Sequence, residues 1–267
     1  MKKTKFGTLG VYTVLYLAFL YVPVLFIPLF SFNDSIYIAF PLKEFTLRHY
    51  ADMIEREPLI NALYNSLKVG IVVSIVSTVF GMLAAKTFTK YRIPGSKSLT
   101  AFISIPLVIP LIILGISLLT VLKSVGVTLS LITIGAAHTV ICIPFAMFVL
   151  ISRLEGFDKS MEEAAQDLGE SPWMTFWRVT FPLAMPGIIA SLLLCFTISF
   201  DEFILAFFLG SDEPTLPLYM WSQLRFPAKL PSVLALGSVI FITSFFLVCF
   251  AEWVRRRGVQ TQTGSAI

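Results

Sequence analysis

Long apolar runs constrain this chain more than any other feature of its sequence. A helix rises about 1.5 Å per residue, so about 20 apolar residues can cross the roughly 30 Å hydrocarbon core of a membrane. Six runs of this length are present, at about 9–30, 61–85, 99–122, 129–151, 187–209 and 231–253. We therefore predict an all-α integral membrane fold with six transmembrane helices.

The composition agrees with a membrane protein. Of the 267 residues 57% are hydrophobic and 13% are charged, and the mean hydropathy is +0.85, whereas soluble proteins carry about 25% charged residues. The first run is longer than the apolar region of a secretory signal, about 7–15 residues, so we expect a retained first span. Cys142, Cys195 and Cys249 lie inside apolar runs, and we interpret them as small buried hydrophobes without a disulfide.

Basic residues beside the spans predict the orientation. The formal net charge is +4, but the basic residues flank apolar runs and do not form a polar domain, so we expect no nucleic-acid partner. Cytoplasmic loops carry an excess of lysine and arginine. The clusters are Lys2, Lys3 and Lys5; Lys86, Lys90, Arg92 and Lys97; and Arg255, Arg256 and Arg257. We predict that both termini are cytoplasmic, with 86–98 and 152–186 inside and 31–60, 123–128 and 210–230 outside.

Proline residues interrupt several predicted spans. An interior proline removes a backbone hydrogen bond and kinks a helix. In lipid such a break is tolerated where the freed carbonyl groups are buried in protein or line a wet cavity. The residues are Pro23, Pro28, Pro106, Pro110 and Pro144. Each either sets only a packing angle between helices or marks a break beside a cavity.

The loop 152–186 has the pattern of two short helices joined by a tight turn. Ser160 and Glu163 have the spacing of a capping box, which predicts a helix that begins at Met161 and ends at Gly169. Its surface combines the small Ala164 and Ala165 with the carboxylates of Glu162, Glu163 and Asp167. Such a surface suits docking in a groove of a basic partner.

A second short helix is predicted directly after the turn. Ser171 followed by Pro172 is typical of an N-cap and a first helical residue, and Pro182 is expected to end the helix. Aromatic residues prefer the depth of the lipid headgroups. We therefore expect Trp173, Phe176 and Trp177 to lie there or against the helix bundle.

This loop resembles the EAA loop of the membrane subunits of binding-protein-dependent ABC importers. The matching residues are Glu163, Ala164, Ala165, Gly169, Val179 and Pro182, with valine where the usual pattern has isoleucine. The resemblance implies the type I importer permease (MetI-like) fold, a single transmembrane domain over 1–267 and a bacterial inner-membrane location. It also implies that the first helix enters a cleft of an ATPase subunit, that Glu163 meets basic or polar groups there, and that Gly169 provides the turn. The alternative is that Glu163 only caps its own helix.

The sequence contains no motif for ATP hydrolysis. It has no G-x-x-x-x-G-K-[ST] loop, no H-E-x-x-H and no C-x-x-C pair. We therefore expect no catalytic residue, no metal site and no cofactor in this chain, which is not expected to be an enzyme. The resemblance implies two ATP-binding partner subunits that hold ATP and Mg, a second permease subunit, an extracytoplasmic solute-binding protein and membrane lipid.

Two adjacent acids, Asp201 and Glu202, lie inside the fifth apolar run. Asp201 follows Pro186 by about 15 residues, or roughly 22 Å of helix. An aspartate at the centre of a membrane helix costs about 2.5–3.5 kcal/mol on insertion scales, so it usually faces a cavity or a partner. Asp201 is therefore interpreted either as part of a translocation path that attracts a cation or as a structural ion pair or hydrogen bond between helices. Glu202, about 100° further round the helix, is expected to point elsewhere, for example to the partner subunit. It is still counted with Asp201 and Tyr21 among the candidate residues of the substrate path.

Two further residues are weaker candidates. Tyr21 precedes Pro23 in the first run, where its ring either holds an ammonium group on the substrate path or anchors the span at the interface. His138 in the fourth run is expected to be a hydrogen-bonded packing residue.

Nearly the whole chain is similar to the second permease subunit of spermidine/putrescine transporters. The similarity is carried by Tyr21 and Pro23; Ser31 and Asn33; Arg153, Leu154, Gly156, Phe157 and Asp158; the loop through Pro186; Ser199, Asp201 and Glu202; and Thr215, Leu216 and Pro217. It implies the import of polyamines or related organic cations by alternating access. Leu111 follows Pro110 where polyamine members often have an acid, so a substrate with fewer positive charges is also compatible.

Alternative functions stay open. The same machinery could carry ferric iron, a phosphonate, a sugar or an amino-acid-like compound. A membrane enzyme or channel with an EAA-like turn would instead act without an ATPase partner. Residues 211–226, with Trp221 and Arg225, are expected to form part of the contact with the binding protein.

Overall fold

The computed structural model describes residues 8–91, 93–158 and 160–263, and the side chains among residues 9–246 of these ranges. Helices dominate them, and the described residues contain no strand longer than a single bridge, Asn33 with Phe45. The chain forms two compact units, Met1–Ile60 with Met220–Ile267, called unit 1, and Asn61–Tyr219, called unit 2. The expectation of a single permease domain stays a prediction. Of the basic residues used to predict orientation, Lys2, Lys3, Lys5 and Arg92 lie outside the described residues, as do the side chains of Arg255, Arg256 and Arg257.

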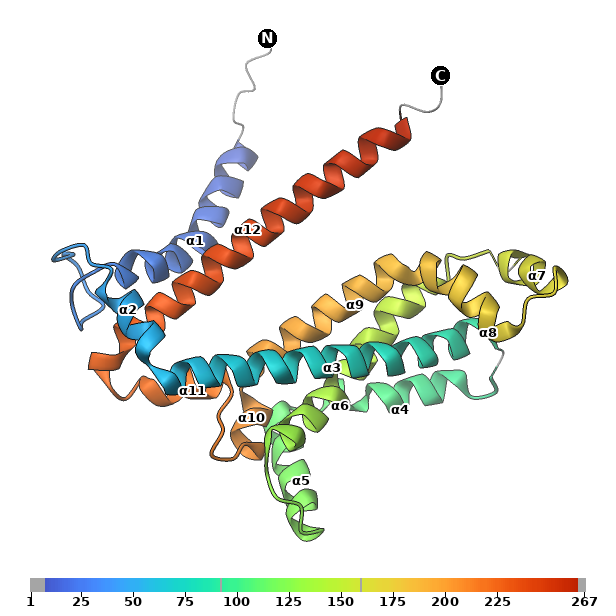
Figure 1. Cartoon of the computed structure of the whole chain (residues 1–267), viewed down its shortest axis with the longest axis horizontal. Helices are drawn as coiled ribbons and strands as arrows, with labels where there is room; N and C mark the ends of the chain where they lie inside the picture. The colour runs from blue at the N-terminus through green and yellow to red at the C-terminus, as the bar shows by residue number, and fades with distance from the viewer. Residues whose placement is uncertain (1–7, 92, 159, 264–267) are drawn as a thin grey trace. The chain divides into compact units, whose positions relative to one another are not determined.

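Unit 1 joins the two ends of the chain. The helices α1 (Thr8–Ser31) and α2 (Arg48–Glu55) both pack against α12 (Leu230–Thr263) (Figure 1). The hydroxyl of Tyr50 on α2 lies 2.7 Å from Ser31 Oγ and 3.3 Å from Ser238 Oγ, so one side chain ties the three helices together. Two shorter elements, α11 (Leu216–Gln223) and the 3₁₀ turn η2 (Pro227–Lys229), precede α12.

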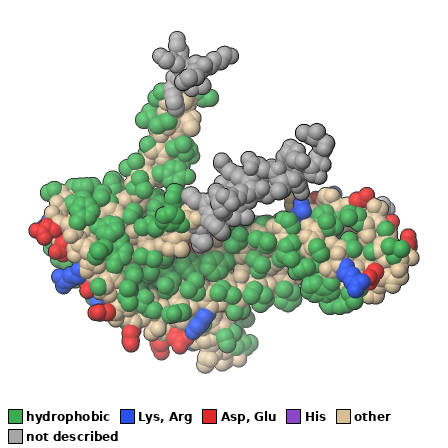
Figure 2. Space-filling model, turned by 45° about the horizontal axis from the view of Figure 1, so that its top comes forward, with side chains coloured by type: hydrophobic (Ala, Val, Ile, Leu, Met, Phe, Trp, Pro, Cys, Tyr) green, Lys and Arg blue, Asp and Glu red, His purple; other side chains and the backbone are tan. Residues whose placement is uncertain are grey.

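Unit 2 contains the remaining helices (Figure 1). In chain order they are α3 (Glu57–Lys90), α4 (Ser96–Val108), α5 (Leu111–Ser124), α6 (Leu131–Leu154), α7 (Ser160–Asp167), α8 (Pro172–Thr175), the π-helical turn η1 (Phe176–Thr180), α9 (Phe181–Asp201) and α10 (Ile204–Leu209). The core lies between α6 and α9, where Cys142 and Cys195 are fully buried with free thiols, as predicted. The side chain of the third cysteine, Cys249, lies outside the described residues. Figure 2 shows hydrophobic side chains over most of the visible face, with charged side chains gathered towards its edges.

Five of the six predicted spans correspond to helices that could cross a membrane, and the sixth corresponds to a bent pair of helices. Five described helices are long and apolar enough to cross a membrane, and α4 and α5 together make a sixth candidate that is bent by 98°. Pro23, Pro28, Pro106 and Pro144 lie inside helices that continue past them. Only at Pro110 does the helix break, because the preceding Ile109 is extended, with ψ of 129°, as a residue before proline prefers.

The fifth predicted span, 187–209, is also not a single helix. The helix α9 ends at Asp201, Glu202 is extended with ψ of 117°, and the chain resumes as α10 at Ile204. Hydropathy alone gives no sign of this break, since apolar residues lie on both sides of it.

Candidate functional site

The predicted first loop helix is present as α7, with a different start from the one expected. Ser160 lies inside the helix and is not its N-cap, so the predicted capping box with Glu163 is wrong. Asp158 Oδ1 instead accepts a 3.0 Å hydrogen bond from the backbone N–H of Ser160. This bond and one from the Ser160 hydroxyl lower the pKa of Asp158.

The end of α7 follows the prediction. The backbone N–H of Gly169 donates to Gln166 O and that of Glu170 donates to Ala165 O, at 2.9 and 3.1 Å. These two bonds form a Schellman motif with Gly169 at the C′ position. Its φ of +94° is in the left-handed region that favours glycine. The role of Gly169 in the turn is therefore confirmed as local geometry.

The second helix begins as predicted and does not end where predicted. Ser171 Oγ accepts a 3.2 Å hydrogen bond from Met174 N, and Pro172 is the first helical residue. The chain then continues through η1 into α9, so the expectation that Pro182 ends the helix is wrong. Pro182 lies in the first turn of α9, where a missing N–H costs least, and the wider π-helical turn directly precedes it.

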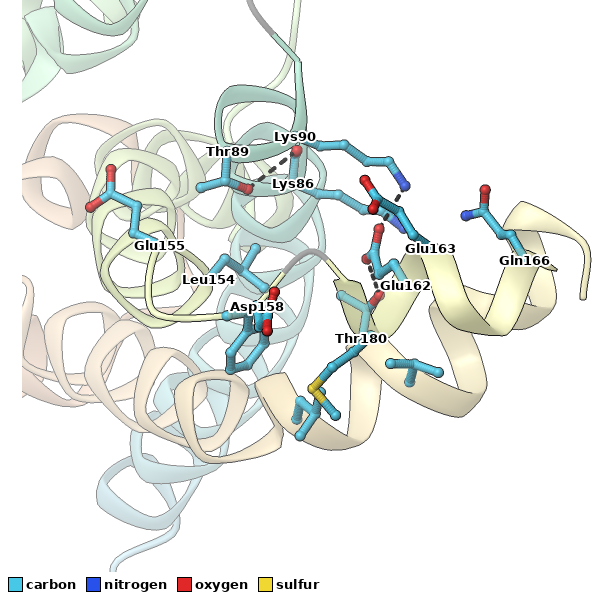
Figure 3. A pocket seen from close by; sticks show the side chains of 14 residues that line it. Lys86, Thr89, Lys90, Leu154, Glu155, Asp158, Glu162, Glu163, Gln166 and Thr180 are labelled. Atoms are coloured by element: carbon cyan, nitrogen blue, oxygen red, sulfur yellow. Dashed lines mark hydrogen bonds and ion pairs between the residues drawn. The ribbon is translucent and has the colours of Figure 1, made fainter. Parts of the chain in front are cut away.

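Glu162 attaches α7 to two other elements of unit 2. Its Oε2 accepts a 2.6 Å hydrogen bond from Lys90 Nζ at the end of α3, and its Oε1 accepts one from the hydroxyl of Thr180 in η1 (Figure 3). Burial alone would raise the pKa of Glu162. The bonds from Lys90 and Thr180 and the charges of Lys90 and Lys86 outweigh it and lower the pKa.

These attachments surround a pocket of about 510 Å³, which is lined from α3, the end of α6, α7 and η1. It brings the segments 86–98 and 152–186 to the same end of unit 2 (Figure 3). At the opposite end, the Asn65 side chain donates to Pro214 O and the Ser66 hydroxyl accepts from Leu216 N. The two segments expected inside thus lie together, away from 210–216, which was expected outside.

The residues expected to dock on an ATPase are accessible, with one exception. Glu163, Ala164 and Gly169 are exposed and Ala165 is half-buried. Glu163 lines the rim of the pocket and forms no ion pair with any residue that the structure describes. The exception is Glu162, which was expected to face a partner and instead is held by Lys90. Sequence reasoning missed this pair because the two residues are 72 positions apart.

The aromatic residues of the second helix divide between the bundle and the surface. Phe176 packs on Phe181 and lies under Lys86 Nζ, 4.4 Å from its ring centroid. Trp173, which is 68% exposed, and Trp177 pack edge to face and point outward. The expected contact with the bundle is present for Phe176, and the headgroup contact of the two tryptophans stays a prediction.

The adjacent acids Asp201 and Glu202 have opposite surroundings. Asp201 is the last residue of α9, and its side chain is exposed. Glu202 is buried, and its carboxylate accepts hydrogen bonds from the backbone N–H groups of Ile204, Leu205 and Ala206 at 2.9, 2.8 and 3.3 Å. The expectation that Glu202 points to a partner subunit is therefore wrong, because its carboxylate closes the first turn of α10.

Two other candidates can be placed. His138 is fully buried, with Nδ1 2.9 Å from Ser199 Oγ, which confirms it as a hydrogen-bonded packing residue. Its Nε2 lies 3.2 Å from Glu202 Oε2, a close contact whose angles are not those of a hydrogen bond. Tyr21 is exposed on α1 in unit 1.

Comparison with known proteins gives close relatives over most of the chain. A family model described as "Binding-protein-dependent transport system inner membrane component" matches residues 77–259. The spermidine/putrescine transport system permease protein PotC of Escherichia coli (strain K12) is 30% identical over 96% of this chain and 96% of its own length. The putrescine transport system permease protein PotI of the same strain is 31% identical over 91% of each chain.

Solved structures resemble the chain in fold. A bacterial alginate ABC transporter, in complex with an alginate pentasaccharide-bound periplasmic protein, has a TM-score of 0.70 and 17% identity, over 94% of this chain and 93% of that one. An amino acid ABC transporter with histidines has a TM-score of 0.58 and 16% identity, over 79% of this chain and 99% of that one. Identities this low concern the fold alone, and the predicted fold is confirmed.

Proposed function

This chain belongs to the family of binding-protein-dependent transport system inner membrane components, as a permease subunit of an ATP-driven ABC importer, and we propose that it carries polyamines or related organic cations. The names of its relatives PotC and PotI support a polyamine substrate.

One observation carries the substrate proposal, namely the position of Asp201. Its exposed carboxylate lies at the C-terminal end of the 21-residue helix α9. The helix dipole places partial negative charge at that end, so the carboxylate and the last carbonyl groups add their potentials. Both favour a cation. Discontinuous helices whose C-terminal ends attract cations are a recurring feature of transporter sites near the membrane midplane.

A second helix break, at Pro110, narrows the substrate class. The helix α5 that follows it packs against α10. The chain resumes there with Leu111, the first residue of α5, which contributes no charge. Among the described residues at these two breaks Asp201 is the exposed acid, so a dication such as putrescine is matched better than the trication spermidine.

The cytoplasmic side of the proposal concerns α7. We assign 86–98, 152–186 and both termini to the cytoplasm, where two separate subunits bind ATP and Mg. The exposed Glu163 and Ala164 and the half-buried Ala165 dock on one of these subunits, and a second permease subunit and an extracytoplasmic binding protein complete the importer. Closure of the ATP-binding subunits then supplies the differential free energy that favours one of two states of the bundle, and the solute crosses by alternating access.

Uptake by cells that express this chain with its partner subunits tests the substrate. We expect Asp201→Asn to raise the apparent KM for putrescine about tenfold, because loss of one charge contact in a partly dry path removes about 1.4 kcal/mol. Glu213→Gln, which changes an exposed acid of the 210–216 segment, is the matched control and should leave uptake unchanged. Wild-type kinetics for Asp201→Asn, or uptake that neither putrescine nor spermidine competes for, would contradict the proposal.

Docking is tested separately. We expect Glu163→Ala to reduce co-purification of the ATP-binding subunit and ATP-driven uptake about fivefold, as for the loss of about 1 kcal/mol at an interface. Glu155→Ala removes another exposed acid of the same pocket rim and should have no such effect. Unchanged uptake by Glu163→Ala at normal membrane levels would remove the docking role.

A further inference from the structure

We propose that Glu202, His138 and Ser199 act as positioning residues, a buried polar staple that holds the fifth span broken and so presents Asp201 to the translocation path. The idea deepens the proposed function and rests on the role given there to Asp201. None of the three residues touches the solute in this proposal. They act by deciding where the adjacent carboxylate points.

The break itself is made by the Glu202 side chain. Its two oxygens accept from three successive backbone N–H groups, those of Ile204, Leu205 and Ala206. The first N–H groups of a helix have no partner within the helix. Because the carboxylate supplies these partners, α10 can start anew at this point without leaving unsatisfied groups in a buried, apolar region.

The same carboxylate lies against a residue of a different helix. His138 on α6 is fully buried, and its Nε2 lies 3.2 Å from Glu202 Oε2 while its Nδ1 lies 2.9 Å from Ser199 Oγ on α9. The network therefore includes α6, the end of α9 and the start of α10. The bonds to Glu202 and the bond between His138 and Ser199 favour this arrangement of the chain, and the His138 ring holds its place beside the carboxylate through Nδ1, while Nε2 makes a close contact without a hydrogen bond.

Without the staple, the surrounding sequence favours a different backbone. The apolar run 187–209 has the composition of an uninterrupted helix. In such a helix Asp201 would be an interior residue. The backbone carbonyl groups around it would then accept hydrogen bonds from the N–H groups of the following turn. The end of α9, and with it the added negative potential beside Asp201, exists only because the chain turns at Glu202.

Thiol labelling of the assembled importer tests the proposal without relying on transport. Asp201→Cys is introduced after Cys142, Cys195 and Cys249 have been replaced by alanine, and its reaction rate with a small cationic methanethiosulfonate reagent is measured. We expect rapid labelling, slowed at least tenfold by Glu202→Leu or His138→Leu. Glu213→Gln should leave the rate unchanged.

A milder variant distinguishes loss of positioning from loss of the fold. Glu202→Gln keeps one acceptor oxygen for the N–H groups and has nearly the same shape, so we expect it to slow labelling about threefold at normal membrane levels. Labelling that is unchanged in both Glu202→Gln and His138→Leu would overturn the proposal, as would a failure of Asp201→Cys to react with the staple intact. If labelling responds as expected while Asp201→Asn transports normally, the positioning role stands and the substrate role of Asp201 falls.

Discussion

Lys90 at the end of α3 donates a 2.6 Å hydrogen bond from Nζ to Oε2 of Glu162 on α7. The other oxygen of the same carboxylate accepts from Thr180, one residue before α9 begins. A single side chain thus connects α7 to α3 and to the turn that leads into α9. A displacement of α7 by a partner would be passed to both α3 and α9 through this carboxylate.

Removing this connection should uncouple ATP hydrolysis from uptake. The two side chains are 31% and 22% exposed, so the pair is worth about 1 kcal/mol, at the upper end of surface ion pairs. We expect Lys90→Met or Glu162→Gln to lower the number of solute molecules imported per ATP hydrolysed about fivefold. A factor of about five corresponds to a free energy of about 1 kcal/mol. The exchange Lys90→Glu with Glu162→Lys should recover part of the loss. Lys97→Met, at the same end of unit 2, is the control, and equal coupling ratios in all variants would refute the connection.

The pH dependence of this connection follows from the lowered pKa of Glu162. A carboxyl group whose pKa is lower in the folded state adds stability above its unfolded value and loses it as the pH falls through the folded pKa. The ordinary value is 4.5, so the contribution is complete at neutral pH and disappears in more acidic solution. Thermal unfolding of wild type and Glu162→Gln should therefore differ by a constant amount above about pH 6 and converge below pH 4.5. A stability difference between wild type and Glu162→Gln that grows as the pH falls would contradict this prediction.

Substitutions of Gly169 should destabilise the loop to different degrees, in an order set by the new side chain. Its φ of +94° costs a residue with a Cβ about 1–2 kcal/mol, least for asparagine and most for a β-branched side chain. We expect the stability of the loop, measured by its rate of limited proteolysis, to fall from glycine to Asn, Ala and Val. Gly156→Ala is the matched control in the same loop, because its φ is not positive and the nearest atom to an added Cβ is 3.9 Å away. Equal proteolysis of Gly169→Val and wild type would show that the turn is not required.

Gly81 on α3 permits a close helix crossing. A Cβ there would lie 2.6 Å from Ala146 Cβ and 2.9 Å from the Ala146 carbonyl carbon, and backbone cannot move aside easily. We expect Gly81→Ala to lower the free energy of unfolding by about 1–3 kcal/mol. Gly135→Ala, where the nearest atom is 3.8 Å away, should be neutral. Equal melting temperatures of the two purified variants would refute this packing.

Local features of the chain were predictable because they depend on neighbouring residues. The apolar runs predict the spans, and Gly169, Ser171 and Pro172 predict the turn of the loop, since caps and turns are decided within a few positions. The exposure of Glu163 and Ala164 follows from the same local pattern.

Distant pairs were not predictable in this way. The bond from Lys90 to Glu162 joins residues 72 positions apart, and the contact of His138 with Ser199 joins residues 61 apart. These contacts exist only once α3, α6, α7 and α9 have packed. The three N–H groups that Glu202 accepts from are local, but the burial of its carboxylate beside His138 depends on the packing of α6 against α9. The sequence by itself determined which segments enter the membrane and where the loop turns, because hydropathy and backbone preference are local. Tertiary structure alone decided which of two adjacent carboxylates is buried and which is exposed, because burial depends on the helices that pack around each side chain.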